Sequence, residues 1–198
     1  DPDERTWLRD ETGGSVYLRL TTNPIEQPGK RVDDAFRQGT IDGAYWLRKP
    51  GPNPDLIIAY QGSIAPEAIK AAGRIGQDRR DVGVLAVTSA DRLNAGWTAA
   101  KRARQRGSAQ ARSHVERLLA PIGRDCTIVT VIDGHPLTLG WLGAVLGHRT
   151  VPLGVEHFGQ TGTIQDLYRH FSIDADAIVD AAHEFTTGRP IRVAPEQG

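Results

Sequence analysis

The stretch VTVIDGHPLTLGWLGAVLG, residues 129–147, decides the fold class of this chain. It opens with four β-branched residues, which pack well in a buried strand. Asp133 and Gly134 end this apolar run, and residues 137–146 have the composition of a helix. A buried strand that leads directly into a helix is the repeating unit of mostly parallel sheets that are covered by helices.

The same alternation of strands and helices extends outward from this stretch. Strands are predicted at residues 41–47, 55–60, 81–89, 128–132 and 150–153. Helices are predicted after Ser63, over 90–120 in two pieces with a break at Gly107 and a cap at Ser108, over 137–146, over 164–171 with a cap at Thr163, and after a cap at Asp174. The prediction is an α/β fold with three layers, in which helices cover both faces of a mostly parallel sheet of about five strands.

The first 40 residues differ in pattern from the rest of the chain. Residues 14–22 alternate in the manner of a strand, and the segment after them is broken by Pro24, Pro28 and Gly29. The expected division of the chain is the end of a preceding domain at 1–22, a linker at 23–40, the α/β domain at 41–186 and a C-terminal tail at 187–198.

Composition excludes several classes of protein. The 24 basic and 24 acidic residues give a formal charge of zero and are interleaved along the chain, which predicts a mixed surface and no binding to nucleic acid. No apolar run reaches the ~18 residues of a membrane helix, so no membrane contact is expected. Cys126 is the single cysteine, which rules out an internal disulfide and favours a cytoplasmic location with a buried, inert thiol.

The sequence lacks the common catalytic and nucleotide-binding motifs. It has no phosphate-binding loop, no dinucleotide fingerprint and no GxSxG nucleophile elbow. Its six histidines never fall in an HxH or HExxH spacing, so no metal site is predicted. Gly62 and Ser63 are interpreted as an ordinary turn between a strand and a helix.

The end of the strand in the opening stretch provides the candidate site. Ligands and partner domains dock at the carboxyl edge of open α/β sheets, and the first amides of a helix attract anions. Asp133, Gly134, His135 and Thr138 are therefore candidates for an interface or an anion site, and His157 is added from the next loop. Because no second catalytic group accompanies His135 beyond Asp133, the adopted interpretation is a structural turn and not an active site.

Three segments resemble a known family. Residues 84–93, 128–147 and above all 151–182, VPLGVEHFGQTGTIQDLYRHFSIDADAIVDAA, resemble the C-terminal domain of the transketolase superfamily. Within the superfamily they look most like the homodimeric pyruvate dehydrogenase decarboxylating component. The resemblance covers the chain from about Ile41 to Ala182 and implies the same α/β fold.

The resemblance also implies a context for the chain. In this superfamily, thiamine diphosphate and Mg²⁺ lie between two preceding domains, on GDG and Asn-Asn motifs that this sequence lacks. Residues 14–22 would then be the last strand of the pyrimidine-binding domain. The expectation is a non-catalytic structural domain that binds no cofactor, packs against the preceding domains of its parent enzyme and supports a homodimer. The parent is expected to be an active thiamine-dependent enzyme and this chain alone inactive.

Two other functions remain open from the sequence. The chain could be a stand-alone regulatory module that binds an anionic ligand at residues 133–138. A small hydrolase built around His135 or His157 is the weakest alternative, because no nucleophile accompanies either histidine.

Overall fold

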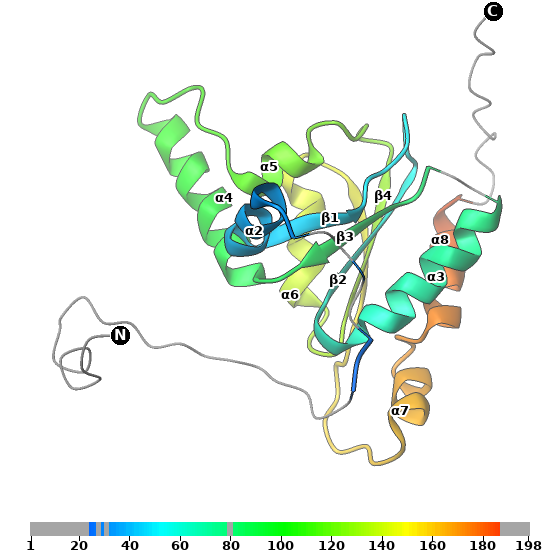
Figure 1. The fold of residues 1–198 in the computed structure, drawn as a ribbon. Coiled ribbons are helices and arrows are strands. Elements are labelled where there is room, and N and C mark those ends of the chain that lie inside the picture. The colour runs from blue at the N-terminus through cyan, green and yellow to red at the C-terminus, as the bar shows by residue number, and fades with distance from the viewer. Residues whose placement is uncertain (1–23, 27–28, 30–31, 79–80, 187–198) are drawn as a thin grey trace, which may run out of the picture.

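The computed structural model describes residues 24–26, 29, 32–78 and 81–186 (Figure 1). The strand predicted at 14–22 and the tail predicted at 187–198 lie outside these residues. Helix α2, Asp34–Asp42, begins inside the predicted linker 23–40. The division into domains therefore stays a prediction.

The centre of the fold is a sheet of five strands in the order β1-β3-β2-β4-β5. The strands are β1 Ala44–Arg48, β2 Leu56–Gln61, β3 Gly83–Val87, β4 Thr127–Ile132 and β5 Arg149–Leu153. Strand β1 runs antiparallel to β3, and the other three pairings are parallel. The prediction of a mostly parallel sheet of about five strands is confirmed.

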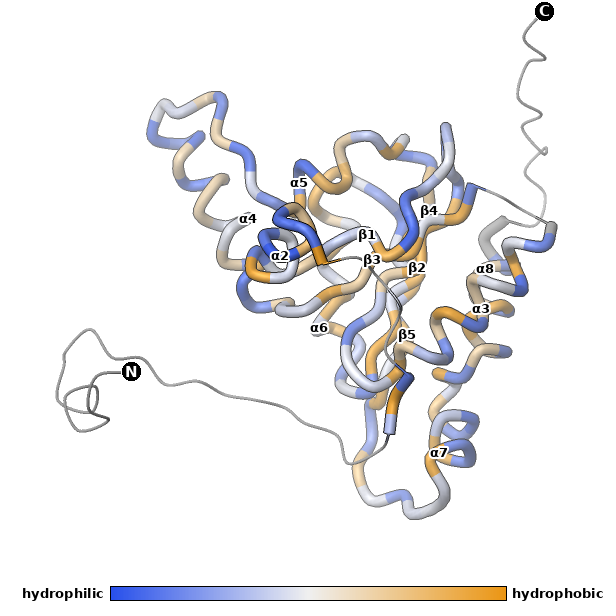
Figure 2. Tube along the Cα trace, viewed as in Figure 1, coloured by the Kyte–Doolittle hydropathy of each residue, from blue (hydrophilic) through white to orange (hydrophobic). Residues whose placement is uncertain are grey.

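Both faces of the sheet are buried, which explains why its central strands have no polar alternation. Side chains of consecutive residues point to opposite faces of a strand. On β2, Ile57 and Ala59 therefore enter one core cluster, while Ile58 and Tyr60 enter the other. Figure 2 shows the hydrophobic residues gathered along the central strands.

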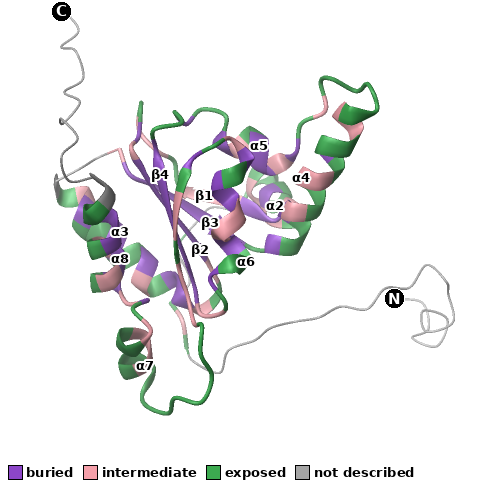
Figure 3. Ribbon diagram, turned by 180° about the vertical axis from the view of Figure 1, so that it is seen from behind, coloured by how far each residue is buried: buried purple, intermediate pink, exposed green. Residues whose placement is uncertain are grey.

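Helices form one layer on each face of the sheet (Figures 1 and 3). Helices α3, Ala65–Asp78, and α8, Ala175–Thr186, pack together on one face. The other face carries α4 Ala90–Gln105, α5 His114–Leu119, and α6 Leu137–Gly140 with the 3-10 helix Trp141–Val145. Helix α7, Ile164–His170, has no buried residue and follows the loop after β5.

The predicted strand at 41–47 begins too early. Residues 41 and 42 close helix α2, which starts with the Asp33 carboxylate accepting from the Phe36 N–H at 2.8 Å. Gly43 then ends the helix with φ of 106°, a conformation that glycine adopts without a steric cost. The strand that follows is Ala44–Arg48.

The break in the helical region 90–120 also differs from the prediction. The second helix starts after Ser113 and not after Ser108, because Ser113 and Glu116 form a capping box. The Ser113 N–H donates to the Glu116 carboxylate at 2.7 Å, and the Glu116 N–H donates to the Ser113 hydroxyl at 3.3 Å. Ser108 lies instead in the connection between the two helices.

The helix predicted at 137–146 is one α-helical turn continued by a 3-10 helix. Gly143 packs directly on β5, and a Cβ there would lie 1.8 Å from Oγ1 of Thr150. The caps predicted for the last two helices are confirmed: the Asp166 N–H donates to Thr163 and the Ala177 N–H donates to Asp174. Cys126 is buried as predicted.

None of the helices among the described residues is both long enough and apolar enough to span a bilayer.

Candidate functional site at the carboxyl edge of the sheet

The carboxyl edge of the sheet is the place where a ligand or a partner is expected in this fold. The parallel strands β2, β4 and β5 all end there. The residues that follow them are Gly62 and Ser63 after β2, Asp133 after β4, and Gly154 after β5. The structure thus brings together turns that lie far apart in the sequence.

Asp133 is part of a polar cluster with Ser63 and Tyr168. One oxygen of the half-buried Asp133 carboxylate accepts a hydrogen bond from the Ser63 hydroxyl. The Ser63 hydroxyl lies 3.3 Å from the hydroxyl of Tyr168 on α7. This cluster, called the edge cluster below, connects the end of β4, the turn after β2 and helix α7. It gives Asp133 a structural role.

The sequence analysis missed two members of the edge cluster. Ser63 could have been found, because it follows the strand that pairs with β4 and so reaches the same edge as Asp133. Tyr168 carried no such signal, since it lies 105 residues from Ser63 in the sequence.

The glycines at this edge allow the turns to approach one another closely. Gly62 has φ of 83°, and a Cβ on it would lie 3.0 Å from the Asp133 carboxylate. A Cβ on Gly154 would lie 2.5 Å from the carbonyl oxygen of Gly134 and 2.7 Å from the nitrogen of Pro136. The Val155 N–H donates to the same Gly134 carbonyl at 2.8 Å. The predicted site residue Gly134 therefore joins the loops after β4 and β5.

His135 lies exposed at the start of α6 and accepts a hydrogen bond there. The Leu137 N–H donates to its Nδ1 at 3.3 Å, and the Thr138 N–H donates to its carbonyl at 3.0 Å. The next amide, of Leu139, donates to the carbonyl of Pro136 at 3.2 Å. The first amides of this short helix already have acceptors, so the geometry does not favour an anion site at residues 133–138.

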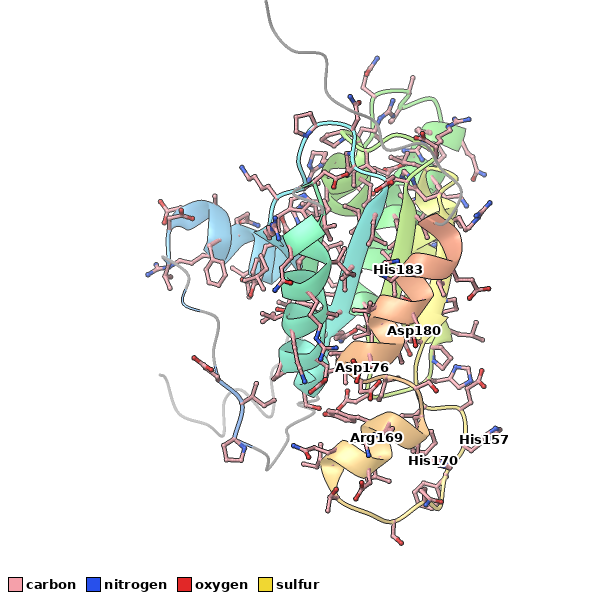
Figure 4. All side chains as sticks on the ribbon, turned by 90° about the vertical axis from the view of Figure 1, so that its right-hand side faces the viewer. His157, Arg169, His170, Asp176, Asp180 and His183 are labelled. Carbon is pink, nitrogen blue, oxygen red and sulfur yellow. The ribbon has the colours of Figure 1, made fainter. Side chains whose placement is uncertain are left out.

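The two remaining candidates lie on the surface. Thr138 is exposed, and its carbonyl accepts from the indole N–H of Trp141 at 3.0 Å. His157 is exposed on the loop before α7, where Figure 4 shows it pointing outward from the molecule. By contrast, His148 is buried, and this burial lowers the pKa of its imidazole. A buried neutral imidazole is suited to packing.

An open groove of about 380 Å³ lies between α4 and α6, beside Thr138. Its lining residues are Ala90, Asp91, Asn94, Ala95, Thr138 and Trp141. The ring of Trp141 stacks on Trp97 with 5.5 Å between centroids. Asp91 is the only titratable residue in this lining, which leaves the groove without a pair of groups for acid–base catalysis.

The described part of the chain offers no site that fits thiamine diphosphate with Mg²⁺. Among the residues that the structure describes, no group of three or more His, Cys, Asp or Glu side chains could hold a metal ion. At the carboxyl edge, the carboxylate of Asp133 is already engaged by Ser63. The GDG and Asn-Asn motifs expected for the cofactor are missing from the sequence. No catalytic step through the cofactor is therefore derived for this chain.

Comparison with known proteins gives a family match. Residues 43–174, about two thirds of the chain, match the family described as the transketolase-like TK C-terminal domain. No protein with a curated description matches the chain.

Solved structures of transketolases have a similar fold. The enzyme from Leishmania mexicana aligns with a TM-score of 0.56 and 20% identity, over 80% of this chain and 20% of that one. Transketolase from Campylobacter jejuni subsp. jejuni NCTC 11168 aligns with a TM-score of 0.51 and 17% identity, over 72% of this chain and 18% of that one. A split-gene transketolase, described as an inactive β4 tetramer, aligns with a TM-score of 0.52 and 16% identity, over 75% of this chain and 44% of that one. The chain thus spans about a fifth of the length of the first two relatives.

Proposed function

The chain belongs to the family of transketolase-like C-terminal domains, and on that premise we propose that it is the non-catalytic structural domain of a thiamine diphosphate-dependent enzyme. In this role it packs against the preceding domains of the enzyme and supports a homodimer. The observation that carries the proposal is the family match over residues 43–174. Because this match is to a C-terminal domain, the cofactor-binding residues are assigned to other parts of the enzyme.

The surface around the carboxyl edge supports a docking role. Leu137 on α6 is 71% exposed, Phe158 on the loop after β5 is fully exposed, and Ile164 at the start of α7 is 42% exposed. These three residues, called the apolar edge below, lie in the segments that follow β4 and β5, beyond the carboxyl ends of the strands where ligands bind in α/β folds. Exposed apolar side chains such as these are available for an interface. His135 and His157, in the same two connecting segments, are also exposed.

The finer assignment within the family is to a pyruvate dehydrogenase decarboxylating component. It is supported by the resemblance of residues 151–182 to that component. The parent enzyme would then bind thiamine diphosphate and Mg²⁺ in its preceding domains and act in the cytoplasm. Assaying the parent enzyme with pyruvate and with sugar phosphates tests this assignment, and turnover of sugar phosphates alone would reject it.

The first experiment asks whether the chain binds the cofactor. Thiamine diphosphate with Mg²⁺ is titrated into the chain in a calorimeter, and the melting temperature is measured in parallel. We expect no binding heat and no rise in melting temperature, because a ligand that binds only the folded state would raise it. Saturable binding would overturn the non-catalytic role.

The second experiment tests the docking surface in the parent enzyme. The variant Leu137→Asp introduces a charge into the apolar edge, and Ile41→Asp is its control because Ile41 is 56% exposed on α2. The first variant is expected to lower the fraction of dimeric, active enzyme, and the second to leave it unchanged. Equal behaviour of the two variants in sedimentation and activity assays would reject this surface as the interface.

The regulatory alternative, with an anion bound at residues 133–138, stays a prediction that this geometry does not favour.

A further inference from the structure

A second surface with a distinct chemistry lies on the connection from α4 to α5. Residues 101–117, called the basic arm below, contain six basic residues and one acidic residue, Glu116. The basic residues are Lys101, Arg102, Arg104, Arg106, Arg112 and Arg117. The formal charge of the arm is therefore plus five, and the rest of the chain carries minus five because the whole chain is neutral. The even mixture of charges predicted from the sequence does not hold in this region.

The outer part of the basic arm, from the end of α4 to Arg112, projects away from the sheet, whereas Val115 and Glu116 at its base are buried. The last buried residue of α4 is Ala100, so the final part of that helix packs against little of the core. Figure 1 shows the end of α4 and the following loop extending outward, and Figure 3 shows most of this region exposed. Because α4 connects two parallel strands and runs back along the sheet, the arm lies at the amino ends of the strands. It therefore faces away from the carboxyl edge.

Most of the positive charge on the arm is not neutralised within the described part of the chain. Arg104 forms an ion pair with Glu116 at 2.8 Å. Arg112 and Arg117 donate to main-chain carbonyls, and the Lys101 ammonium lies 4.5 Å from the centroid of the Trp97 ring. No ion pair with a carboxylate is recorded for these three cations, or for Arg102 and Arg106, among residues 32–78 and 81–186.

The helix dipole accounts for only part of this cluster. Arg102 and Arg104 lie in the last turn of α4, and Arg117 lies in the last turn of α5, where cations are favourable. Arg106 is the C-cap of α4 and shares this benefit, whereas Arg112 lies just before the start of α5, where the dipole does not favour a cation. At the base of the arm, the Asp42 carboxylate of α2 lies 3.7 Å from the His114 ring. The exposed end of the arm remains strongly positive.

We propose that the basic arm is a docking surface for an acidic segment of a partner protein. Five of its six basic residues are arginines, whose planar guanidinium groups bind carboxylates through two parallel hydrogen bonds. A segment rich in Asp and Glu supplies such carboxylates. The surface is separate from the proposed packing at the carboxyl edge, because it lies at the opposite end of the sheet.

Nucleic acid fits this surface less well. The rest of the chain has a formal charge of minus five, which would repel a long polyanion that extends beyond the arm. A short acidic segment avoids this repulsion. Binding to single strands also relies on exposed aromatic rings that stack with bases. Trp97, the aromatic residue beside the arm, is covered by Lys101 and by Trp141.

The test measures binding of a fluorescently labelled decaglutamate peptide to the whole chain by anisotropy. Its central variant is Arg102→Gln combined with Arg106→Gln, and the matched control is Lys70→Gln combined with Arg169→Gln on α3 and α7. All four side chains are exposed, and each pair removes two charges. We expect the arm variant to weaken binding about tenfold, and the control to weaken it less than about twofold. Binding should weaken as salt is raised from about 0.05 M to about 0.2 M.

Three results would overturn the proposal. The first is absence of peptide binding, or equal weakening by the two variants. The second is tighter binding of a single-stranded oligonucleotide that carries the same charge as the peptide, which would assign the arm to nucleic acid. The third is a dimer in sedimentation that the arm variant dissociates and the control does not, which would assign the arm to a second copy of this chain. Circular dichroism of both variants checks that they remain folded.

Discussion

The two ends of the sheet present opposite kinds of surface. At the carboxyl edge, the polar groups of Ser63, Asp133 and Tyr168 contact one another, and the exposed residues include Leu137 and Phe158. At the other end, the basic arm exposes charged side chains, and Arg104 alone among its basic residues is recorded in an ion pair with a carboxylate among the described residues. An exposed apolar surface favours a permanent interface, whereas exposed charged groups favour interactions that weaken as the salt concentration rises. This difference is the one that the two proposals require, with an edge covered within an enzyme and an arm that meets a partner reversibly.

The largest expected effect comes from comparing a Gly→Ala substitution at the carboxyl edge with one on α4, the helix that leads to the arm. Gly154→Ala should lower the free energy of unfolding by about 2 kcal/mol or more, because its Cβ would lie within 2.8 Å of backbone atoms of Gly134 and Pro136. Gly96→Ala on α4 should raise it by about 0.5–1 kcal/mol, since glycine in a helix is unfavourable and nothing lies within 4 Å. Urea denaturation measures both changes. A destabilisation shared by both variants would show that the two sites do not differ in packing.

The base of the arm is tested by Glu116→Gln. The Glu116 carboxylate accepts hydrogen bonds from the Ser113 N–H, the Ser113 hydroxyl and Arg104. The variant should therefore lower the free energy of unfolding by about 1–3 kcal/mol at pH 7. Burial alone would raise the pKa of Glu116, but these donors outweigh it and the pKa is lowered.

This lowered pKa predicts how stability depends on pH. The contribution of Glu116 is fully present above its unfolded pKa of about 4.3 and is lost as the pH falls through the lower folded value. Unfolding curves at several pH values should therefore show the wild-type chain losing its advantage over Glu116→Gln in acid. An advantage that persists unchanged in acid would contradict the role of the ionised carboxylate.

The edge cluster predicts a smaller effect for Tyr168→Phe. Removing the hydroxyl that lies 3.3 Å from Ser63 should cost about 0.5–1 kcal/mol, the usual net contribution of one hydrogen bond. Helix α7 has no buried residue, so its amides should exchange with deuterium faster in the variant, while those of α3 and α8 keep their rates. If exchange in α7 is unchanged, the hydroxyl does not hold this helix on the edge.

The smallest effect is expected for Phe158→Ser in the isolated chain. Because Phe158 is fully exposed, its replacement should change the free energy of unfolding by less than about 0.5 kcal/mol. The same change should reduce association of the chain at high concentration, as measured by light scattering. A loss of stability above that limit would mean that Phe158 packs within the chain and is not available for docking.

Much of the fold could be predicted because its signals are local. The apolar run before Asp133 identifies a buried strand, and Thr163 and Asp174 identify helix starts through hydrogen bonds to residues three positions away. The wrong start predicted for the second helix of residues 90–120 also has a local cause, because two nearby serines could each cap it. Ser108 and Ser113 both suit a helix start, and only the pairing of Ser113 with Glu116 decides between them.

The α/β class, the buried Cys126 and the turn at Asp133 to Pro136 all follow from local patterns in the sequence, because periodicity and capping depend on near neighbours. Tertiary structure decided which distant groups meet. Ser63 and Asp133 are 70 residues apart, and they meet because β2 and β4 pair in parallel and end at one edge. It also decided that the charges at the end of α4 project from the core, since Ala100 is the last buried residue of that helix. Contacts between distant residues depend on how strands pair, which no short stretch of sequence specifies.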